Sequence, residues 1–186
     1  MRLDGTDRPR ILIVFSLDAT TELGVNTEAN VLAAMCFQIE RPCHLVVFTG
    51  GIFNREKGQY SSAARMMQEF WKHHFVISHQ AGLNFTPSTM IEEGSKTTRQ
   101  NIANVFERLA KHGYNLQECD VYVVSERWHL VGIDYLFRRL YNVRVERISS
   151  NFRESLAGIC GRAIRLILYR IDPKGTGWLS RRKIRQ

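Results

Sequence analysis

Polar residues that could bind or react with a ligand gather at three points of the sequence. The last of these is Ser125-Glu126-Arg127-Trp128-His129, which directly follows an apolar run. An imidazole titrates near neutral pH, so His129 could act as a general acid or base or bind a phosphate. A lone histidine is more often a surface or supporting residue. A Ser125 nucleophile is the less favoured interpretation, because no Gly-x-Ser-x-Gly motif surrounds it.

The segment 92–101 is the second point. Ser95 suits the N-cap of a helix predicted to begin at Lys96, and the free N–H groups of such a start, together with Thr98, predict a cradle for an anion. Capping alone accounts for Ser95. It does not account for Asn101, a poor helix former that would hold the loop or reach a ligand. Glu92 is a second candidate general base.

The third point is Gly50-Gly51, at the end of another apolar run. Residues without a Cβ let the backbone turn sharply and come close to a ligand, although a plain tight turn explains the pair equally well. Asp18 is the residue after the first apolar run that we place nearest a ligand. Neither a P-loop nor a Gly-x-Gly-x-x-Gly motif occurs. The cysteines and acids lack ligand spacing, and we predict no metal site.

Short apolar runs alternate with longer segments of helical spacing, which predicts an α/β protein with a Rossmann-like three-layer fold. The central sheet is expected to be mostly parallel, with about five strands. Right-handed crossovers would then bring the loops after the strands, and the three polar groups, to one edge. The segment 80–94 is predicted to be a long functional loop. Predicted strands are 11–16, 44–49, 75–78, 120–125 and 143–148, and predicted helices are 27–38, 61–72, 96–111, one through Leu136 and 152–169.

Length and charge limit the class of protein. The 186 residues, 44% hydrophobic and 24% charged, predict one ordered domain over residues 1–170 with a basic tail at 171–186. The net charge of +8 favours an anionic partner, although four of the last six residues are basic. A solvated tail is the simpler interpretation, and a weak nucleic-acid or membrane-surface contact is the alternative. No apolar run is long enough to span a membrane, so a cytoplasmic location is expected.

Taken together, the three groups resemble the YdcF/SanA/ElyC-like family, a domain family of unknown function. The resemblance covers about residues 11–150 and implies a Rossmann-like fold with a pocket lined by these loops. It also implies a link to envelope or peptidoglycan-precursor processes, with S-adenosylmethionine as a candidate cofactor. The residues that carry it are Gly50 and Gly51, the helix with Ser61, Ala63 and Met66, the pattern Glu92-x-x-Ser95-x-x-Thr98-x-x-Asn101, and Ser125 followed by His129.

Three positions depart from the family pattern. Ser62 stands where an acid is common, Gln100 stands where a glutamate commonly precedes the asparagine, and Gly132 stands where an arginine follows the histidine. Arg127 would supply the missing positive charge from the other side of His129. The expectation for the fold does not depend on these positions, whereas a shared activity does.

Two functions follow from these patterns. The first is a pocket protein, either an enzyme of group transfer or hydrolysis or a binding protein, for a phosphorylated, nucleotide-like or S-adenosylmethionine-like small molecule. The second is a binding or regulatory module for an anionic partner, a nucleic acid or a membrane surface. It would use basic residues near the C-terminus: Arg153, Arg162, Arg165, Arg170 and the tail 181–186. The substrate, the metal requirement and the oligomeric state stay open on the sequence alone.

Overall fold

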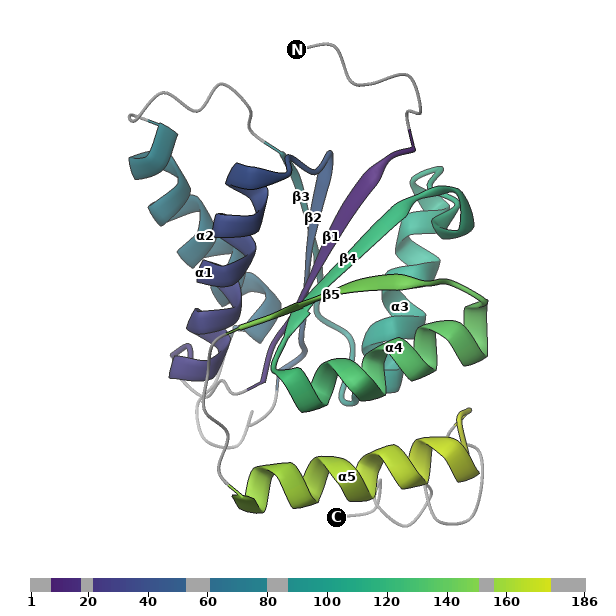
Figure 1. The fold of residues 1–186 in the computed structure, drawn as a ribbon. Coiled ribbons are helices and arrows are strands. Elements are labelled where there is room, and N and C mark those ends of the chain that lie inside the picture. The colour runs from purple at the N-terminus through teal and green to yellow at the C-terminus, as the bar shows by residue number, and fades with distance from the viewer. Residues whose placement is uncertain (1–7, 18–21, 53–60, 80–86, 151–155, 175–186) are drawn as a thin grey trace.

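The computed structural model describes residues 8–17, 22–52, 61–79, 87–150 and 156–174 (Figure 1). In this part of the chain, five parallel strands form one central sheet with helices on both faces. The prediction of an α/β, Rossmann-like three-layer fold is therefore confirmed. None of the described helices is long and apolar enough to cross a membrane.

The sheet has the strand order β3-β2-β1-β4-β5. The chain moves outward from β1 through β2 to β3, and then returns across the sheet to β4 on the other side of β1. In open parallel sheets, ligands bind beyond the carboxyl ends of the strands where the strand order reverses, which here is between β1 and β4. The strands are β1 (Arg10–Phe15), β2 (Leu45–Thr49), β3 (Ser88–Glu92), β4 (Asp120–Ser125) and β5 (Val145–Ser149).

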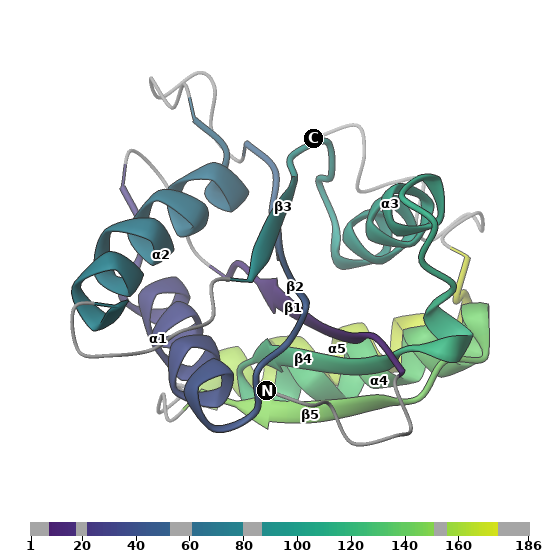
Figure 2. The ribbon, with the colours of Figure 1, turned by 90° about the horizontal axis from the view of Figure 1, so that it is seen from above.

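The helices form the two outer layers, and the view from above separates them clearly (Figure 2). Helices α1 (Val25–Glu40) and α2 (Ala63–His79) cover one face of the sheet. Helices α3 (Thr98–Lys111) and α4 (Arg127–Tyr141) cover the other face. Helix α5 (Leu156–Ile171) packs on α4, outside these layers (Figure 1). The chain between α3 and β4 forms a short 3₁₀ helix, Leu116–Glu118.

Strand β1 lies at the centre of the sheet and contributes side chains to the hydrophobic core on each of its two faces. Its residues from Ile11 to Phe15 are fully buried, as expected for a parallel strand covered by helices on both faces. Ile13 and Phe15 belong to the core under α3 and α4, whereas Leu12 and Val14 belong to the core under α1 and α2. The alternation fixes which face of the sheet each side chain at the strand ends occupies.

The third predicted strand is wrong. Residues 75–78 continue helix α2, which runs to His79, and the third strand is β3, inside the segment 80–94 that was predicted to be a loop. An apolar run of four residues does not distinguish a strand from a helix. Strand β3 lies at the edge of the sheet and only Glu92 among its five residues is buried, so it lacks the continuous apolar run of the central strands.

Candidate functional site

All the strands end at one edge of the sheet, which we call the carboxyl edge. Backbone hydrogen bonds of 3.1 Å continue the strand pairing one residue further, from Ser16 N to Thr49 O and from Gly50 N to Glu92 O. A third joins Ser150 N to Ser125 O at the same length. Ser16, Gly50 and Ser150, which follow β1, β2 and β5, are therefore each held to the neighbouring strand.

Glu92 is the centre of a buried hydrogen-bond network at this edge. The residue is 1% exposed, and each carboxylate oxygen accepts two hydrogen bonds. Oε2 accepts from the hydroxyls of Thr49 (2.9 Å) and Ser95 (2.8 Å), and Oε1 accepts from Gly94 N and Asn104 Nδ2, both at 2.8 Å. A carboxylate has about four acceptor positions. All are used within the protein, so Glu92 has a structural role at this edge, and its role as a general base stays a prediction.

Ser95 does not cap helix α3, and this expectation is wrong. The helix begins at Thr98, and the side chain of Thr97 accepts the capping hydrogen bond from Gln100 N (3.3 Å). Ser95 is instead buried beside Glu92, and its hydroxyl also forms a hydrogen bond with the side-chain amide of Asn101. Asn101 therefore holds the loop, which was one of the two roles considered for it.

Oxygen atoms of the chain itself accept hydrogen bonds from some of the N–H groups at the start of α3, where the anion cradle was predicted. The Lys96 N–H donates to the side chain of Gln100 (2.7 Å), and the Gln100 N–H donates to Thr97. The Asn101 N–H donates to the Thr97 carbonyl (2.9 Å), as in the body of a helix. Of the residues predicted to form the cradle, Lys96 thus has its N–H satisfied internally.

His129 lies between two hydroxyl groups that come from different parts of the chain. Its Nδ1 is 2.8 Å from Ser125 Oγ, at the end of β4, and its Nε2 is 3.1 Å from Thr98 Oγ1, at the start of α3. The Phe15 ring, at the end of β1, meets the imidazole edge to face at 5.9 Å. The histidine is 9% exposed, Ser125 is fully buried and Thr98 is half-buried. The structure therefore brings together three of the predicted site residues at the switch between β1 and β4.

The start of helix α4 lies beside this cluster. His129 is in its first turn, and the N-cap residue Glu126 makes no side-chain capping hydrogen bond within the described residues. The first N–H groups of a helix carry a partial positive charge. Arg127 and Trp128 occupy the same turn with exposed side chains. Asp18 lies outside the described residues.

The loop after β3 is anchored to helix α2 by Glu93. Ser62 caps α2 by accepting a hydrogen bond from Arg65 N (3.0 Å) and donates to Glu93 (2.7 Å). The Arg65 guanidinium contacts both carboxylate oxygens of Glu93 at 3.1 Å. Partial burial would raise the pKa of Glu93, but the hydrogen bonds from Ser62 and Arg65 outweigh it and hold that pKa below its ordinary value. The contact therefore contributes its full stability when the pH is above the ordinary pKa of a glutamate. That contribution is lost as the pH falls through the lowered pKa and Glu93 becomes protonated.

The two glycines after β2 let the chain pack against itself. A Cβ on Gly50 would lie 2.1 Å from Ser16 Oγ, and a Cβ on Gly51 would lie 1.8 Å from the Ser95 carbonyl oxygen. The space beside each glycine is thus filled by the protein. The sequence suggested that a ligand comes close to these glycines. On the side where a Cβ would lie, Ser16 and Ser95 occupy that space.

Sequence reasoning missed Ser16 and Ser150 as candidate ligand-binding residues. They are 6% and 2% exposed, and neither hydroxyl has a hydrogen-bond partner in the described part of the chain. The side-chain oxygen of Asn30, on α1, also lacks one there, although its amide group donates to Phe15 O (2.8 Å). A buried polar group without a partner is costly, and such groups point to a ligand or water. The only sequence signal was that a serine follows or ends three of the strands.

We expect opposite effects from the same substitution at two equally buried serines. Ser16→Ala should raise the free energy of unfolding by up to about 1 kcal/mol, because it removes a hydroxyl without a partner. Ser95→Ala should lower it by about 1–3 kcal/mol, because Glu92 and Asn101 lose a partner. Urea unfolding at neutral pH measures both. Equal destabilisation by the two variants would show that the Ser16 hydroxyl is satisfied in the native protein.

No family model, curated protein or solved structure matches the chain. Among the residues that the structure describes, no group of three or more His, Cys, Asp or Glu side chains is placed to hold a metal ion.

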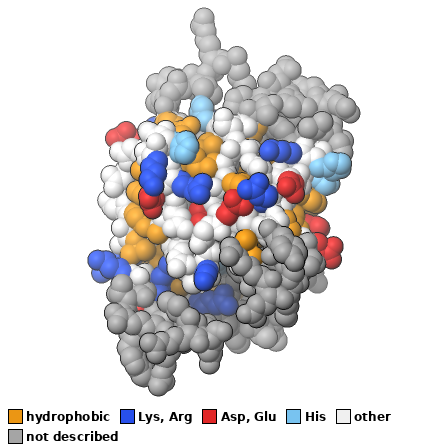
Figure 3. Space-filling model, turned by 180° about the vertical axis from the view of Figure 1, so that it is seen from behind, with side chains coloured by type: hydrophobic (Ala, Val, Ile, Leu, Met, Phe, Trp, Pro, Cys, Tyr) orange, Lys and Arg blue, Asp and Glu red, His pale blue; other side chains and the backbone are white. Residues whose placement is uncertain are grey.

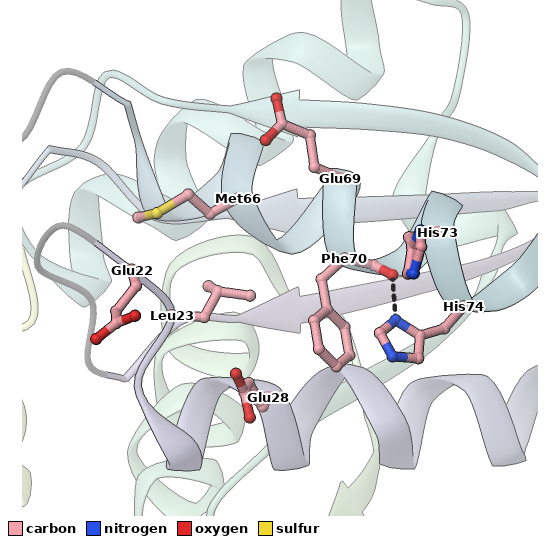
Figure 4. A pocket seen from close by; sticks show the side chains of 8 residues that line it. All are labelled: Glu22, Leu23, Glu28, Met66, Glu69, Phe70, His73 and His74. Carbon is pink, nitrogen blue, oxygen red and sulfur yellow. Dashed lines mark hydrogen bonds between the residues drawn. The ribbon is translucent and has the colours of Figure 1, made fainter.

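Two hollows are lined by described residues, and both lie apart from His129. The larger, about 390 Å³, is between α1 and α2. In Figure 4 the rings of Phe70 and His74 stack at one end, Glu22 lies at the other end, and Glu28 lies between them. The smaller, about 230 Å³, lies along α3 next to Glu92. The larger hollow is lined by Glu22, Leu23, Glu28, Met66, Glu69, Phe70, His73 and His74, none of which belongs to the predicted site.

Proposed function

We propose that this protein binds a phosphorylated small molecule at the carboxyl edge between β1 and β4, and that His129 is its acid–base group. The observation that carries the proposal is the position of His129. It is held by hydroxyls of Ser125 and Thr98 in the first turn of α4, where the strand order reverses. Resemblance to the YdcF/SanA/ElyC-like family supports the same place in the fold and suggests a role in envelope-precursor metabolism.

The surroundings of His129 favour an anion that also carries hydroxyl groups. The N-terminus of α4 attracts negative charge, and the exposed Arg127 adds a full positive charge beside it. Ser16 and Ser150 supply buried hydroxyls without partners among the described residues. A nucleotide or a sugar phosphate offers this combination, and S-adenosylmethionine offers the hydroxyls and a carboxylate.

The two hydroxyls beside His129 have different roles in this proposal. Ser125 is fully buried, so it orients the ring through Nδ1. Thr98 is half-buried and lies on the Nε2 side. In hydrolysis, His129 takes a proton from the attacking water as the new P–O bond forms. It returns that proton to the leaving oxygen as the old P–O bond breaks.

The test is a thermal-shift screen against inorganic phosphate, nucleotides, sugar nucleotides, S-adenosylmethionine and isoprenoid phosphates, with product detection for each stabilising compound. A ligand at 100 times its Kd stabilises the native state by about 2.7 kcal/mol. We expect His129→Ala to lose both the stabilisation and any turnover. His129→Gln keeps hydrogen-bonding groups of similar reach but cannot exchange a proton near neutral pH, so it should keep binding and lose turnover.

The matched control is His112→Gln, because His112 is exposed at the end of α3 and binds Arg108 O (2.8 Å). It should behave as the wild type in every assay. If no compound raises the melting temperature, or if the stabilisation by a compound is unchanged in His129→Ala, His129 is not part of a binding site for these compounds. Binding without turnover of any compound would leave a binding protein and reject the acid–base role.

A further inference from the structure

Helix α5 presents an apolar stripe to solvent. Ile164, Ile167 and Ile171 are 59%, 57% and 65% exposed. Because each residue of a helix advances by about 100°, positions i, i+3 and i+7 lie on one face. We call these three side chains the isoleucine stripe. A contiguous exposed apolar surface of this kind marks an interaction site more often than a single exposed side chain does.

The opposite side of α5 is fixed to the domain, so the stripe cannot turn inward. Tyr169 packs over Gly132, where a Cβ would lie 3.1 Å from the tyrosine ring. The Arg99 guanidinium stacks on Tyr169 at 4.9 Å and donates hydrogen bonds to the carbonyl oxygens of Leu168 (3.4 Å) and Asp172. Contacts from α3 and α4 thus set the rotation of α5 about its axis.

Basic side chains predominate around the stripe, with Asp172 as the acidic residue directly after it. Arg165 directly follows Ile164, Arg170 directly precedes Ile171, Lys174 follows the end of the helix, and all three are exposed. The sequence of α5 contains no Asp or Glu. On the face of the molecule in Figure 3, by contrast, basic and acidic side chains are interspersed. The sequence after α5 continues the pattern with Trp178, Leu179 and the basic residues 181–183 and 185.

We infer that α5 docks on the surface of an anionic lipid bilayer. The isoleucine stripe enters the boundary between headgroups and acyl chains, and Arg165, Arg170 and Lys174 meet the lipid phosphates. Long basic side chains reach the headgroups from the edge of an apolar face. A second copy of the chain, packed stripe to stripe about a two-fold axis, would bring these cations together. A nucleic acid would leave three isoleucines in water. The inference does not depend on the ligand proposed for the carboxyl edge.

The test is vesicle co-sedimentation of the full chain with phosphatidylcholine alone and with 30% phosphatidylserine. We expect binding to the anionic vesicles that falls at least about 10-fold when Ile164, Ile167 and Ile171 are all replaced by serine. Replacing Arg165, Arg170 and Lys174 by glutamine should weaken it by about 100-fold, since each cation contributes about one kilocalorie per mole. That variant should also lose most of the salt dependence of binding.

Helix α1 offers a matched control. Val25, Leu32 and Ile39 are 69%, 47% and 48% exposed and share one helix face, but α1 contains no Lys or Arg. Replacing all three by serine should leave vesicle binding unchanged. Equal binding by the isoleucine-stripe variant, or no binding of the wild type, overturns the inference. A dimer without lipid that the stripe variant converts to a monomer also overturns it, since the stripe would then be a protein–protein interface.

Discussion

Gly51→Ala is expected to destabilise the protein by about 3 kcal/mol or more, or to prevent folding. A Cβ at this position would lie 1.8 Å from the Ser95 carbonyl oxygen and 3.2 Å from the Glu93 carbonyl oxygen. Both atoms belong to the backbone, so no side chain can rotate to make room. The effect is steric, because Gly51 does not have a left-handed backbone conformation. Urea unfolding followed by circular dichroism, or the yield of soluble protein, measures it.

Gly94→Ala is the matched control for this prediction. A Cβ at Gly94 would lie 3.5 Å from Glu92 Oε1 and 3.6 Å from Asn104 Nδ2, which are ordinary contact distances. The free energy of unfolding should change by no more than about 0.5 kcal/mol. If Gly51→Ala is as mild as Gly94→Ala, the loop after β3 does not pack against β2 as the structure describes.

The sequence predicts the fold well where burial is complete. Strand β4 was predicted with its observed bounds, 120–125, because its middle is apolar on both faces of the sheet. Strand β3 was missed because an edge strand, exposed on part of its surface, has no such run. The apolar run 75–78 was taken for a strand because four residues carry too little periodicity to show that helix α2 continues through them.

The sequence identified residues of the candidate site better than it identified what each of them does. Ser125 and His129 are four residues apart, so their contact follows from a strand that leads directly into a helix. Thr98 reaches His129 across 31 positions of the sequence, and only the packing of α3 against α4 makes that contact. The role of Glu92 depends on donors from β2 and α3, whose convergence no local pattern shows.

Each departure from the family pattern has a local structural explanation. Ser62 accepts the capping hydrogen bond of α2 and donates a hydrogen bond to Glu93. An ionised acidic side chain at that position could not donate the second of these bonds. Gln100 accepts the Lys96 N–H at the start of α3. Gly132 leaves room for the ring of Tyr169 and so for the docking of α5. The three residues thus act in the loop anchor, the start of α3 and the contact with α5.

Glu92→Gln is expected to destabilise the protein by about 2–4 kcal/mol although it preserves the shape of the side chain. With its NH₂ group at the Oε1 position, glutamine would face the Gly94 N–H, which can only donate; at the Oε2 position it would face the Thr49 and Ser95 hydroxyls, which can rotate to accept. Even in the second orientation, hydrogen bonds to a buried charged acceptor are replaced by weaker hydrogen bonds with a neutral amide, and the two hydroxyls must turn away from their present direction. Urea unfolding at neutral pH measures the loss.

Glu107→Gln is the control for this substitution. Its carboxylate pairs with Lys111 at the surface of α3, with 64% of the side chain exposed, and exposed pairs of this kind contribute little. The expected change is below about 0.5 kcal/mol. Because Glu92 is proposed to hold the loop and α3 in place, its substitution should lower stability and ligand affinity together and leave the pH dependence of any turnover unchanged. Full stability with loss of turnover would instead return Glu92 to the role of general base.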